Sequence, residues 1–379
     1  MIIYLISKIE RLKMKNYILL VFCLIIFWGA NSLIALPRFS VMFGNKCIDC
    51  HYNPTGGEMR NLAGWNWGKN TLSMISQRDK DYLMSPKIND NISIGIDYRT
   101  QYLYSQEKKR TDFQQMTGSI YTNIGIADNI NLYGKYDFVN MIWEGYAVVH
   151  VIPENIYVKA GSFIPNFGIR IDDHTAYTRG GDFGLLFSKG AYRGLIYNPY
   201  YTEAGIELGI MKDNIFFITS SAGSNLFNNR TLSKDPTYTA RIEITPRIDK
   251  LGLLFGGSFA AAKIPYATKM YGGFVGIGYD SFSLLSEFDF ANDLIGSDVK
   301  SNVLMIETTY EIIIGLNAIV RYDRIDLNKD ISKDEVSHLI LGFEFQPYSF
   351  IEIRPQYRFI IENPSVKNDA FVMQFHFWY

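Results

Sequence analysis

The sequence predicts an all-β fold, an antiparallel β-barrel of about sixteen strands that spans an outer membrane, with a short cofactor-binding segment in front of it. Aromatic residues make up 15% of the 379 residues, and barrels that sit in lipid concentrate such side chains at both interfaces. Apolar and polar residues alternate from Asn91 onward in segments of about ten residues, which is typical of tilted strands that cross a bilayer. The chain ends on the aromatic Tyr379, which resembles the C-terminal signal of outer-membrane barrels.

The alternation is clearest in the first and last segments of this region. Both segments place large apolar residues at every second position, and the residues between them are mostly polar or small: Ile92, Ile94, Ile96 and Tyr98, then Phe371, Met373, Phe375, Phe377 and Tyr379. A soluble β-sandwich would also alternate, but its strands are usually about five or six residues long. The length of these segments favours the barrel.

The connection lengths support a topology with short periplasmic turns and longer outer loops. Sixteen strands are expected near 92–104, 116–126, 130–140, 143–152, 156–164, 202–211, 215–223, 237–246, 251–262, 269–279, 281–291, 301–311, 314–326, 336–346, 350–361 and 369–379. The connection at 140–143 fits less well, because it should be an outer loop and is very short.

One outer connection, from Pro165 to about Tyr201, is far longer than the others. It is either a constriction loop that folds into the lumen or a source of one more hairpin, which would give eighteen strands. Its residues Asp172, Asp173 and His174 could form an external metal contact, because carboxylates with an imidazole suit Fe²⁺ or Mn²⁺.

A simpler interpretation of this loop involves no metal. The acidic residues would then pair with Arg170 and Arg179 in a solvated loop, where such ion pairs contribute little to stability.

The first 35 residues have the pattern of a secretory signal peptide. Basic residues precede an apolar run from Tyr17 to Gly29, and small residues follow it, ending at Ala35. Met14 is an alternative start, and Cys23 lies inside the apolar run and would be removed with it. An uncleaved anchor is the alternative, but the run is shorter than the ~20 residues that a membrane-spanning helix needs.

Charge and motifs exclude several classes of function. Lys and Arg number 37 and Asp and Glu number 38, so the net charge of −1 gives no reason to expect a nucleic-acid partner. The sequence contains no G-x-G-x-x-G that opens a helix, no G-x-S-x-G and no H-E-x-x-H. We therefore nominate no catalytic residues.

The motif that carries chemistry is C-x-x-C-H, formed by Cys47, Cys50 and His51. Two thiols at this spacing can add across the two vinyl groups of one porphyrin, and the adjacent imidazole then reaches the iron. A thiol redox pair would be expected in a βαβ unit and a zinc site would need a second cysteine pair. A disulfide between Cys47 and Cys50 is a further alternative in an exported chain. The motif therefore predicts one covalent haem c.

The second axial ligand of this haem cannot be identified from the sequence. One candidate is a histidine of the barrel. The others are the methionines of the same segment, Met42, Met59, Met74 and Met84. Trp65 and Trp67 would pack on the porphyrin or form a small core. Residues 36–89 are few for a free-standing cytochrome, so we expect this segment to use a wall supplied by the barrel.

A C-x-x-C-H segment that runs into a large aromatic-rich barrel resembles the fused monohaem cytochrome–porins of iron-oxidising and related bacteria. The resemblance implies that Cys47 and Cys50 are the thioether attachment points and that His51 is the proximal iron ligand. It also implies a haem segment that plugs the barrel, with Fe²⁺ oxidised outside and the electron passed to a periplasmic cytochrome, as an iron:cytochrome c oxidoreductase. The flanks, Pro37-Arg38-Phe39 and Asn53 to Gly57, depart from the iron-oxidiser pattern, which leaves the donor and the direction of electron flow open.

The sequence thus predicts a signal peptide at 1–35, a haem-binding segment at 36–89 and a transmembrane barrel at 90–379. The expected function is electron transfer across the bacterial outer membrane, between an extracellular donor or acceptor and a periplasmic cytochrome or other carrier, in contact with membrane lipid. The haem segment would lie in the lumen or the periplasm. Two alternatives remain open: a diffusion porin with a structural or sensory haem segment, and a binding barrel with a disulfide.

Overall fold

The computed structural model describes residues 37–76, 85–171, 173, 175–181, 197, 201–212, 215–222, 236–263 and 267–379. Several sequence predictions lie outside these residues: the signal peptide at 1–35 with Met14 and Cys23, and the side chains of Met84, Asp172 and His174.

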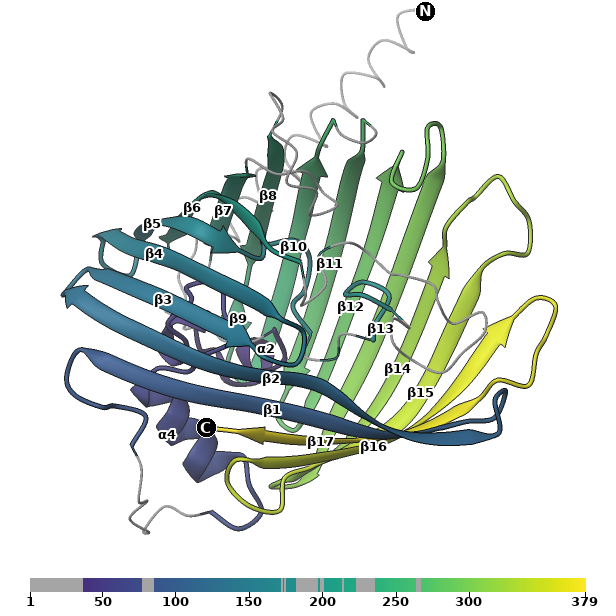
Figure 1. Cartoon of the computed structure of the whole chain (residues 1–379), viewed down its shortest axis with the longest axis horizontal. Coiled ribbons are helices and arrows are strands. Elements are labelled where there is room, and N and C mark those ends of the chain that lie inside the picture. Colours follow the sequence, from purple (N-terminus) through teal and green to yellow (C-terminus); the bar gives the residue numbers. More distant parts are fainter. Residues whose placement is uncertain are drawn as a thin grey trace, which may run out of the picture.

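The strands form one closed antiparallel sheet (Figure 1). Each strand pairs with its neighbours in sequence, and β1 closes the barrel by pairing with both β2 and β17. The strands are β1 Ile92–Ser105, β2 Arg110–Ala127, β3 Ile130–Asp137, β4 Ile142–Ile152, β5 Ile156–Phe163, β6 Glu203–Lys212, β7 Ile215–Ala222, β8 Thr237–Ile244, β9 Arg247–Ile248, β10 Leu251–Ala261, β11 Lys269–Tyr279, β12 Phe282–Asn292, β13 Lys300–Ile313, β14 Leu316–Asp326, β15 Val336–Phe345, β16 Ile351–Glu362 and β17 Ala370–Trp378.

The prediction of a sixteen-stranded antiparallel barrel is confirmed. The two-residue β9 continues β8 along the same partner, β10, so the seventeen strands make sixteen crossings. The alternative of eighteen strands is wrong, because β5 pairs directly with β6 and no hairpin of the long connection enters the wall between them.

Two local features differ from the expected strand limits. β2 begins at Arg110 rather than near 116, because its polar first residues extend the ladder with β1 as far as Ser105↔Arg110. The short connection after β3 is stabilised by Asp137, whose carboxylate accepts bonds from the backbone N–H groups of Val139 and Asn140, both at 3.0 Å. These bonds explain how so short an outer connection closes.

The alternating residues divide between lipid and lumen as a barrel requires. On β17, His376 and Trp378 are buried inside, whereas Phe377 between them is 45% exposed on the outer surface. A closed sheet satisfies its own backbone hydrogen bonds, so only the side chains need to match the hydrocarbon. The apolar outer positions are therefore the lipid-facing surface.

Among the residues that the structure describes, no helix is both long enough and apolar enough to span a bilayer.

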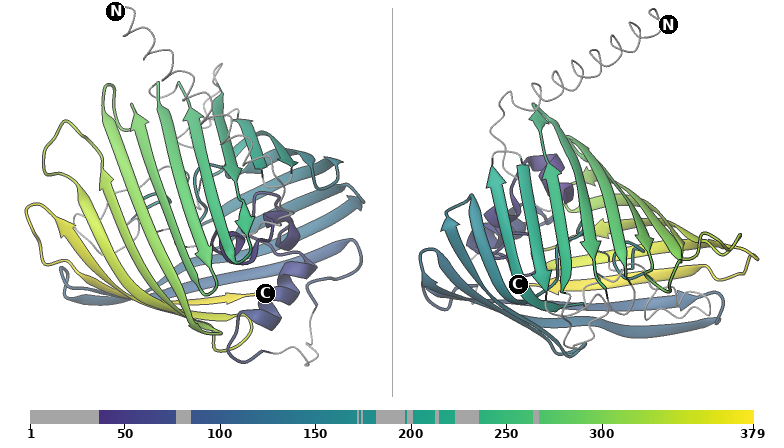
Figure 2. Two further views of the ribbon diagram at one scale, coloured as in Figure 1. Left: turned by 180° about the vertical axis from the view of Figure 1, so that it is seen from behind. Right: turned by 90° about the horizontal axis from the view of Figure 1, so that it is seen from above.

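Residues 37–76, the N-terminal plug, lie inside the wall (Figure 2). The plug contains α2 Pro37–Phe43, α3 Cys47–Cys50 and α4 Leu62–Thr71. α2 packs on β10, β11 and β12, where Gly252 and Gly278 leave room for the backbone of Val41. Since Gly278 lies beside the turn between β11 and β12, the plug occupies the end of the barrel with the short turns.

Residues 164–181, the inner loop, enter the lumen from the opposite direction. The backbone N–H of Ile169 donates to Glu287 on β12 (2.9 Å), and the Tyr177 hydroxyl bonds His338 on β15 (2.9 Å). Phe167 and Tyr177 belong to a buried apolar cluster with wall residues such as Leu103. The described part of the long connection therefore folds inward, as the constriction-loop alternative expected, and both plug and inner loop occupy the lumen.

Candidate functional site

The C-x-x-C-H motif forms a single helical turn within the plug. The backbone N–H of His51 donates to the carbonyl of Cys47 (2.9 Å), and the Asp49 carboxylate accepts a bond from the Lys46 N–H (2.7 Å) at the start of the turn. Cys47 and Cys50 are both free thiols, three residues apart, so they lie on the same side of the turn. This is the arrangement that attachment to one porphyrin requires.

The chain then doubles back as a hairpin over residues 51–60. His51 and Arg60 form an antiparallel bridge, and Gly56 and Gly57 at the tip have φ angles of 80° and 76°. A Cβ atom on Gly56 would lie 3.0 Å from the Cys47 sulfur, so the hairpin folds tightly over the thiol. The turn predicted directly after the motif is present.

The hairpin also settles where Met59 points. Residues paired across an antiparallel bridge share a face, so His51 and Arg60 lie on one face and Met59 on the other. Met59 is buried against the wall at Gly95 and within the apolar cluster of Tyr121. Of the methionines considered as second ligands, Met59 thus faces away from the His51 side.

His51 is buried in the lumen and lines a cavity of about 280 Å³. Burial lowers the pKa of the imidazole to about 4, the Arg60 charge adds to this effect, and the nearby Met59 carbonyl opposes it. The ring is therefore neutral near pH 7, which is the form that binds metals. Its Nδ1 atom is buried without a hydrogen bond of normal geometry.

The two thiols are also held in their neutral form. Burial raises the pKa of Cys47 to about 12, and the nearby Glu243 carboxylate adds to the shift. Burial raises the pKa of the more exposed Cys50 as well. Burial outweighs the nearby guanidinium charges, which are Arg241 and Arg170 at Cys47 and Arg60 at Cys50, so neither thiol is activated as a catalytic thiol would be.

The barrel supplies the wall that the short plug lacks. Ile48 and Tyr52 pack against a row of aromatic rings on the inner surface of β2 to β5, and the Tyr52 hydroxyl bonds Ser93 (2.7 Å). The successive ring centroids in this row are 6.4, 4.7 and 6.4 Å apart: Tyr121, Tyr133, Tyr146 and Phe163.

The two tryptophans of α4 pack in aromatic clusters. Trp65 stacks on Phe350 with centroids 5.4 Å apart, and Trp67 meets the edge of Phe39 at 4.9 Å. A Cβ atom on Gly68 would lie 2.4 Å from the Trp378 ring, so the backbone of α4 packs directly on this side chain of the last strand. These contacts favour the core interpretation of both tryptophans.

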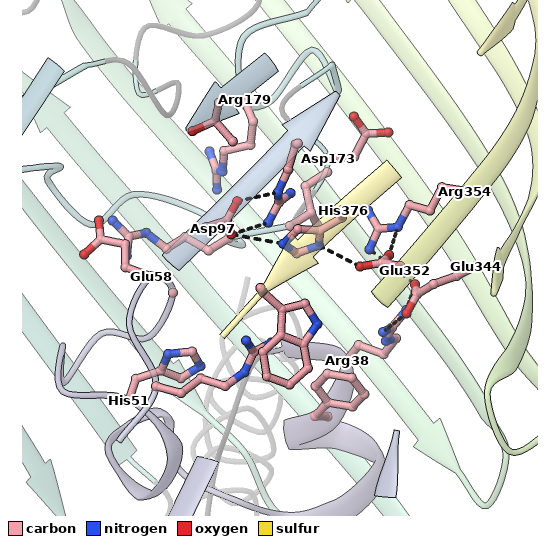
Figure 3. Close-up of a pocket in the computed structure, with 18 of the residues that line it drawn as sticks. Arg38, His51, Glu58, Asp97, Asp173, Arg179, Glu344, Glu352, Arg354 and His376 are labelled. Atoms are coloured by element: carbon pink, nitrogen blue, oxygen red, sulfur yellow. Dashed lines mark hydrogen bonds and ion pairs between the residues drawn. The ribbon is translucent and has the colours of Figure 1, made fainter. Parts of the chain in front are cut away.

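A continuous series of ion pairs, called the ladder below, lines the cavity opposite the plug hairpin (Figure 3). In order, it consists of Arg99, Asp97, His376, Glu352, Arg354, Glu344 and Arg38. It runs from β1 across β17, β16 and β15 to α2 of the plug, where Arg38 donates to both oxygens of Glu344 (2.7 and 2.8 Å).

Two further arginines flank the His51 side of the cavity. The Arg60 guanidinium lies 3.7 Å from the centroid of the Trp378 ring, and Arg170 of the inner loop donates to the Gly56 carbonyl (2.7 Å). Guanidinium groups match carboxylates in geometry and charge. The cavity beside His51 therefore carries two guanidinium groups that suit an anionic ligand.

Of the three residues predicted to form a metal contact, the structure describes only Asp173, and this residue does not face solvent. Asp173 is buried, and its carboxylate lies 2.9 Å from Arg321 and 3.6 Å from Arg358 of the wall. Arg170 and Arg179, the partners expected for a solvated loop, instead contact Gly56 and Glu287. Across the described residues, no group of three His, Cys, Asp or Glu side chains could hold a metal ion; the contact formed with Asp172 and His174 stays a prediction.

The sequence analysis missed the ladder. Its wall members occupy inward positions of their strands, so alternation could have placed each of them in the lumen. The partners come from four strands and a helix that are far apart in sequence, which no local pattern reveals. The sequence analysis considered a histidine of the barrel only as a possible second ligand of the haem and did not single out His376.

No protein-family model and no curated protein matches the chain. Solved structures do match. OmpT of Vibrio cholerae is 10% identical with a TM-score of 0.52, over 77% of this chain and 99% of OmpT. OprB of Pseudomonas putida, solved at high pH, is 10% identical with a TM-score of 0.55, over 76% of this chain and 94% of OprB. The outer-membrane channel DcaP of Acinetobacter baumannii is 12% identical with a TM-score of 0.51, over 76% and 97%. The chain therefore has the fold of porin-like outer-membrane barrels.

Proposed function

We propose that this protein is a c-type cytochrome barrel of the bacterial outer membrane, which transfers electrons between an extracellular donor or acceptor and a periplasmic carrier. Fe²⁺ is one candidate donor. The observation that carries the proposal is the position of the C-x-x-C-H turn inside the lumen, with a neutral His51 on the cavity.

The residues around the motif fit one covalent haem. Cys47 and Cys50 would hold the porphyrin, and His51 would bind the iron through the nitrogen opposite the buried Nδ1. The orientation of such a ligand is usually fixed by a carbonyl near its second nitrogen, and the Met59 carbonyl is near the ring. When bound, the haem would supply a one-electron couple at its iron.

The packing of the lumen supports electron transfer over solute diffusion. The inner loop and the wall form a buried apolar cluster in the half with the long loops, while the plug fills the other end. Arg170 connects the two fillings at Gly56. Plug and inner loop thus occupy space in the lumen that a diffusion porin would need for an open aqueous path.

The position of the plug supports a periplasmic partner. Short turns of bacterial barrels face the periplasm. The α3 turn lies beside one of them, because Glu154, in the turn between β4 and β5, is close enough for its charge to raise the pKa of Asp49. One haem cannot bridge an apolar band of about 25 Å. A carrier that docks at the plug would reach the site directly, and an external donor would have to deliver its electron through the half occupied by the inner loop.

A diffusion porin remains the second candidate. It is favoured by the fold shared with DcaP, which is described as a channel, and by the charged residues that face one another across the cavity. In this case the plug would be a structural or sensory appendage.

The test is covalent haem in outer membranes of cells that also express a c-type maturation system. We expect a haem-stained band at the mature mass whose reduced-minus-oxidised spectrum is that of a c-type cytochrome. Cys47→Ala should remove the stain, while Ile48→Val, inside the same turn, should keep it. A heat-modifiable barrel band without stain, together with ion conductance in planar bilayers, would select the porin.

A further inference from the structure

His376 occupies the centre of the ladder and faces the same cavity as His51. Its Nδ1 lies 2.9 Å from Glu352 Oε2 and its Nε2 lies 3.0 Å from Asp97 Oδ2. An ionised carboxylate only accepts hydrogen bonds, and a neutral imidazole has only one N–H. Both bonds can exist together when the ring is doubly protonated, so the geometry indicates a buried imidazolium.

The other charged groups around His376 are fixed. Asp97 is also paired with Arg99 on β1, and Glu352 is also paired with Arg354 on β16. The next inward residues of β17 itself, Gln374 and Trp378, carry no charge, and the plug contributes Arg60 over the Trp378 ring. Guanidinium groups do not titrate in proteins. His376 is thus the member of the ladder whose charge can change near neutral pH.

His376 lies near the mouth of the barrel that holds the plug. Glu352 is the second residue of β16, and His376 is two residues from the end of β17. The same region contacts the motif, because Arg60 pairs with His51 in the hairpin and covers Trp378.

We propose that His376 is the proton site of this redox centre. The imidazolium that the geometry indicates accompanies the reduced centre. Its proton leaves to periplasmic water when the electron passes to the carrier, and one proton returns from periplasmic water when the centre gains the next electron from the external donor. The net charge of the cavity is then the same in both redox states, which matters because charges interact strongly in a buried site. This inference rests on the proposed function.

The test is the midpoint potential of the haem-loaded protein between about pH 5 and about pH 8, the range in which imidazole titrates. In the wild-type protein we expect a slope approaching about 59 mV per pH unit, the tenfold constant for one proton and one electron. His376→Gln, which keeps a side chain able to donate and accept, should abolish most of this slope. His150→Gln, a half-buried histidine of β4 outside the cavity lining, should keep the wild-type slope.

A flat wild-type profile, or the same slope in His376→Gln, would overturn the inference while leaving the proposed function intact. Failure of the proposed function would appear earlier, as a protein without haem absorption. If His376→Gln does not fold, redox-difference infrared spectra of the wild-type protein replace it. We expect an imidazolium band to appear on reduction, and its absence counts against His376.

Discussion

His51 is neutral because burial and nearby arginines lower its pKa, although a carboxylate also lies close to it. Glu58 lies near enough to raise its pKa, yet burial and Arg60 outweigh that effect. The same burial that prepares the imidazole for iron therefore makes the haem-free plug sensitive to acid.

The haem-free protein should lose plug stability as the pH falls. The pKa of His51 is about 4 in the folded plug against 6.5 for an unperturbed histidine, so the undocked plug binds the proton more tightly. Stability is full above about pH 6.5, decreases on acidification and is about 3 kcal/mol lower at pH 4. Tryptophan fluorescence of protein made without haem maturation, followed against pH, measures this change.

The matched control is His51→Gln, which cannot titrate and should show a smaller decrease over the same range. An equal decrease in both proteins would assign the acid sensitivity to other groups.

Gly68 is the residue at which α4 touches the barrel most closely. Gly68→Ala would place a methyl group 2.4 Å from the Trp378 ring. The overlap should lower the stability of the folded plug by about 1–3 kcal/mol. The better helix propensity of alanine offsets at most about 1 kcal/mol of this loss. We expect the plug to be released by protease at a lower temperature than in the wild-type protein. Gly134→Ala, at a position with no atom within 4 Å, should leave this temperature unchanged, and a shift of equal size would contradict the argument.

At the residue scale, the motif alone was sufficient to predict Cys47, Cys50 and His51 as the candidate site. It could not predict the direction of Met59, because that depends on the register of a hairpin set by Gly56 and Gly57. The inward loop acids could not be assigned either, since the partners of Asp173 lie on β14 and β16.

At the scale of elements, α2 is attached to the wall both by its packing on β10, β11 and β12 and by the ion pair of Arg38 with Glu344. Glu344 is almost fully buried, so Arg38→Ala leaves a carboxylate inside the lumen that keeps Arg354 (3.3 Å) and the Gln346 amide (3.3 Å) as partners. Truncating one partner of a buried, hydrogen-bonded charge pair costs about 2–5 kcal/mol, and Arg354 keeps the expected loss near the lower end. The urea concentration at which the plug becomes protease-sensitive measures it.

Lys250→Ala serves as the control for this variant, because Lys250 forms a solvent-exposed ion pair with Asp280 at the same end of the barrel. We expect no measurable change there. A plug that tolerates Arg38→Ala equally well would show that apolar contacts of α2 suffice.

Period-two alternation located each strand because each has one face in lipid and one in the lumen. The same reasoning gave no access to the inner loop, whose course is fixed by long-range bonds such as the one from Ile169 to Glu287. Strand β2 was predicted too short for a related reason, because its first residues pair with β1 beyond the apolar band.

At the scale of the whole molecule, plug and inner loop occupy the lumen in series. Removing only one filling should leave the ion conductance low, whereas removing both should give the aqueous channel expected of sixteen strands. The variants are deletion of residues 37–76, deletion of the inner loop residues 164–181, and their combination. The whole loop is deleted because Glu287, His338 and Arg321 of the wall all hold it. Single-channel recording in planar bilayers distinguishes them, and a large conductance in either single variant would show that one filling alone seals the barrel.

The tight fold of the hairpin over Cys47 also orders events in the life of the protein. An enzyme that attaches a haem must hold the cysteines in an extended segment, but in the finished molecule Cys47 lies against Gly56 and α4 is pressed on Trp378 of the closing strand. Under the proposed function, attachment must therefore come before the first and last strands meet. A barrel that closed without its haem would then have its cysteines out of reach of the attaching enzyme.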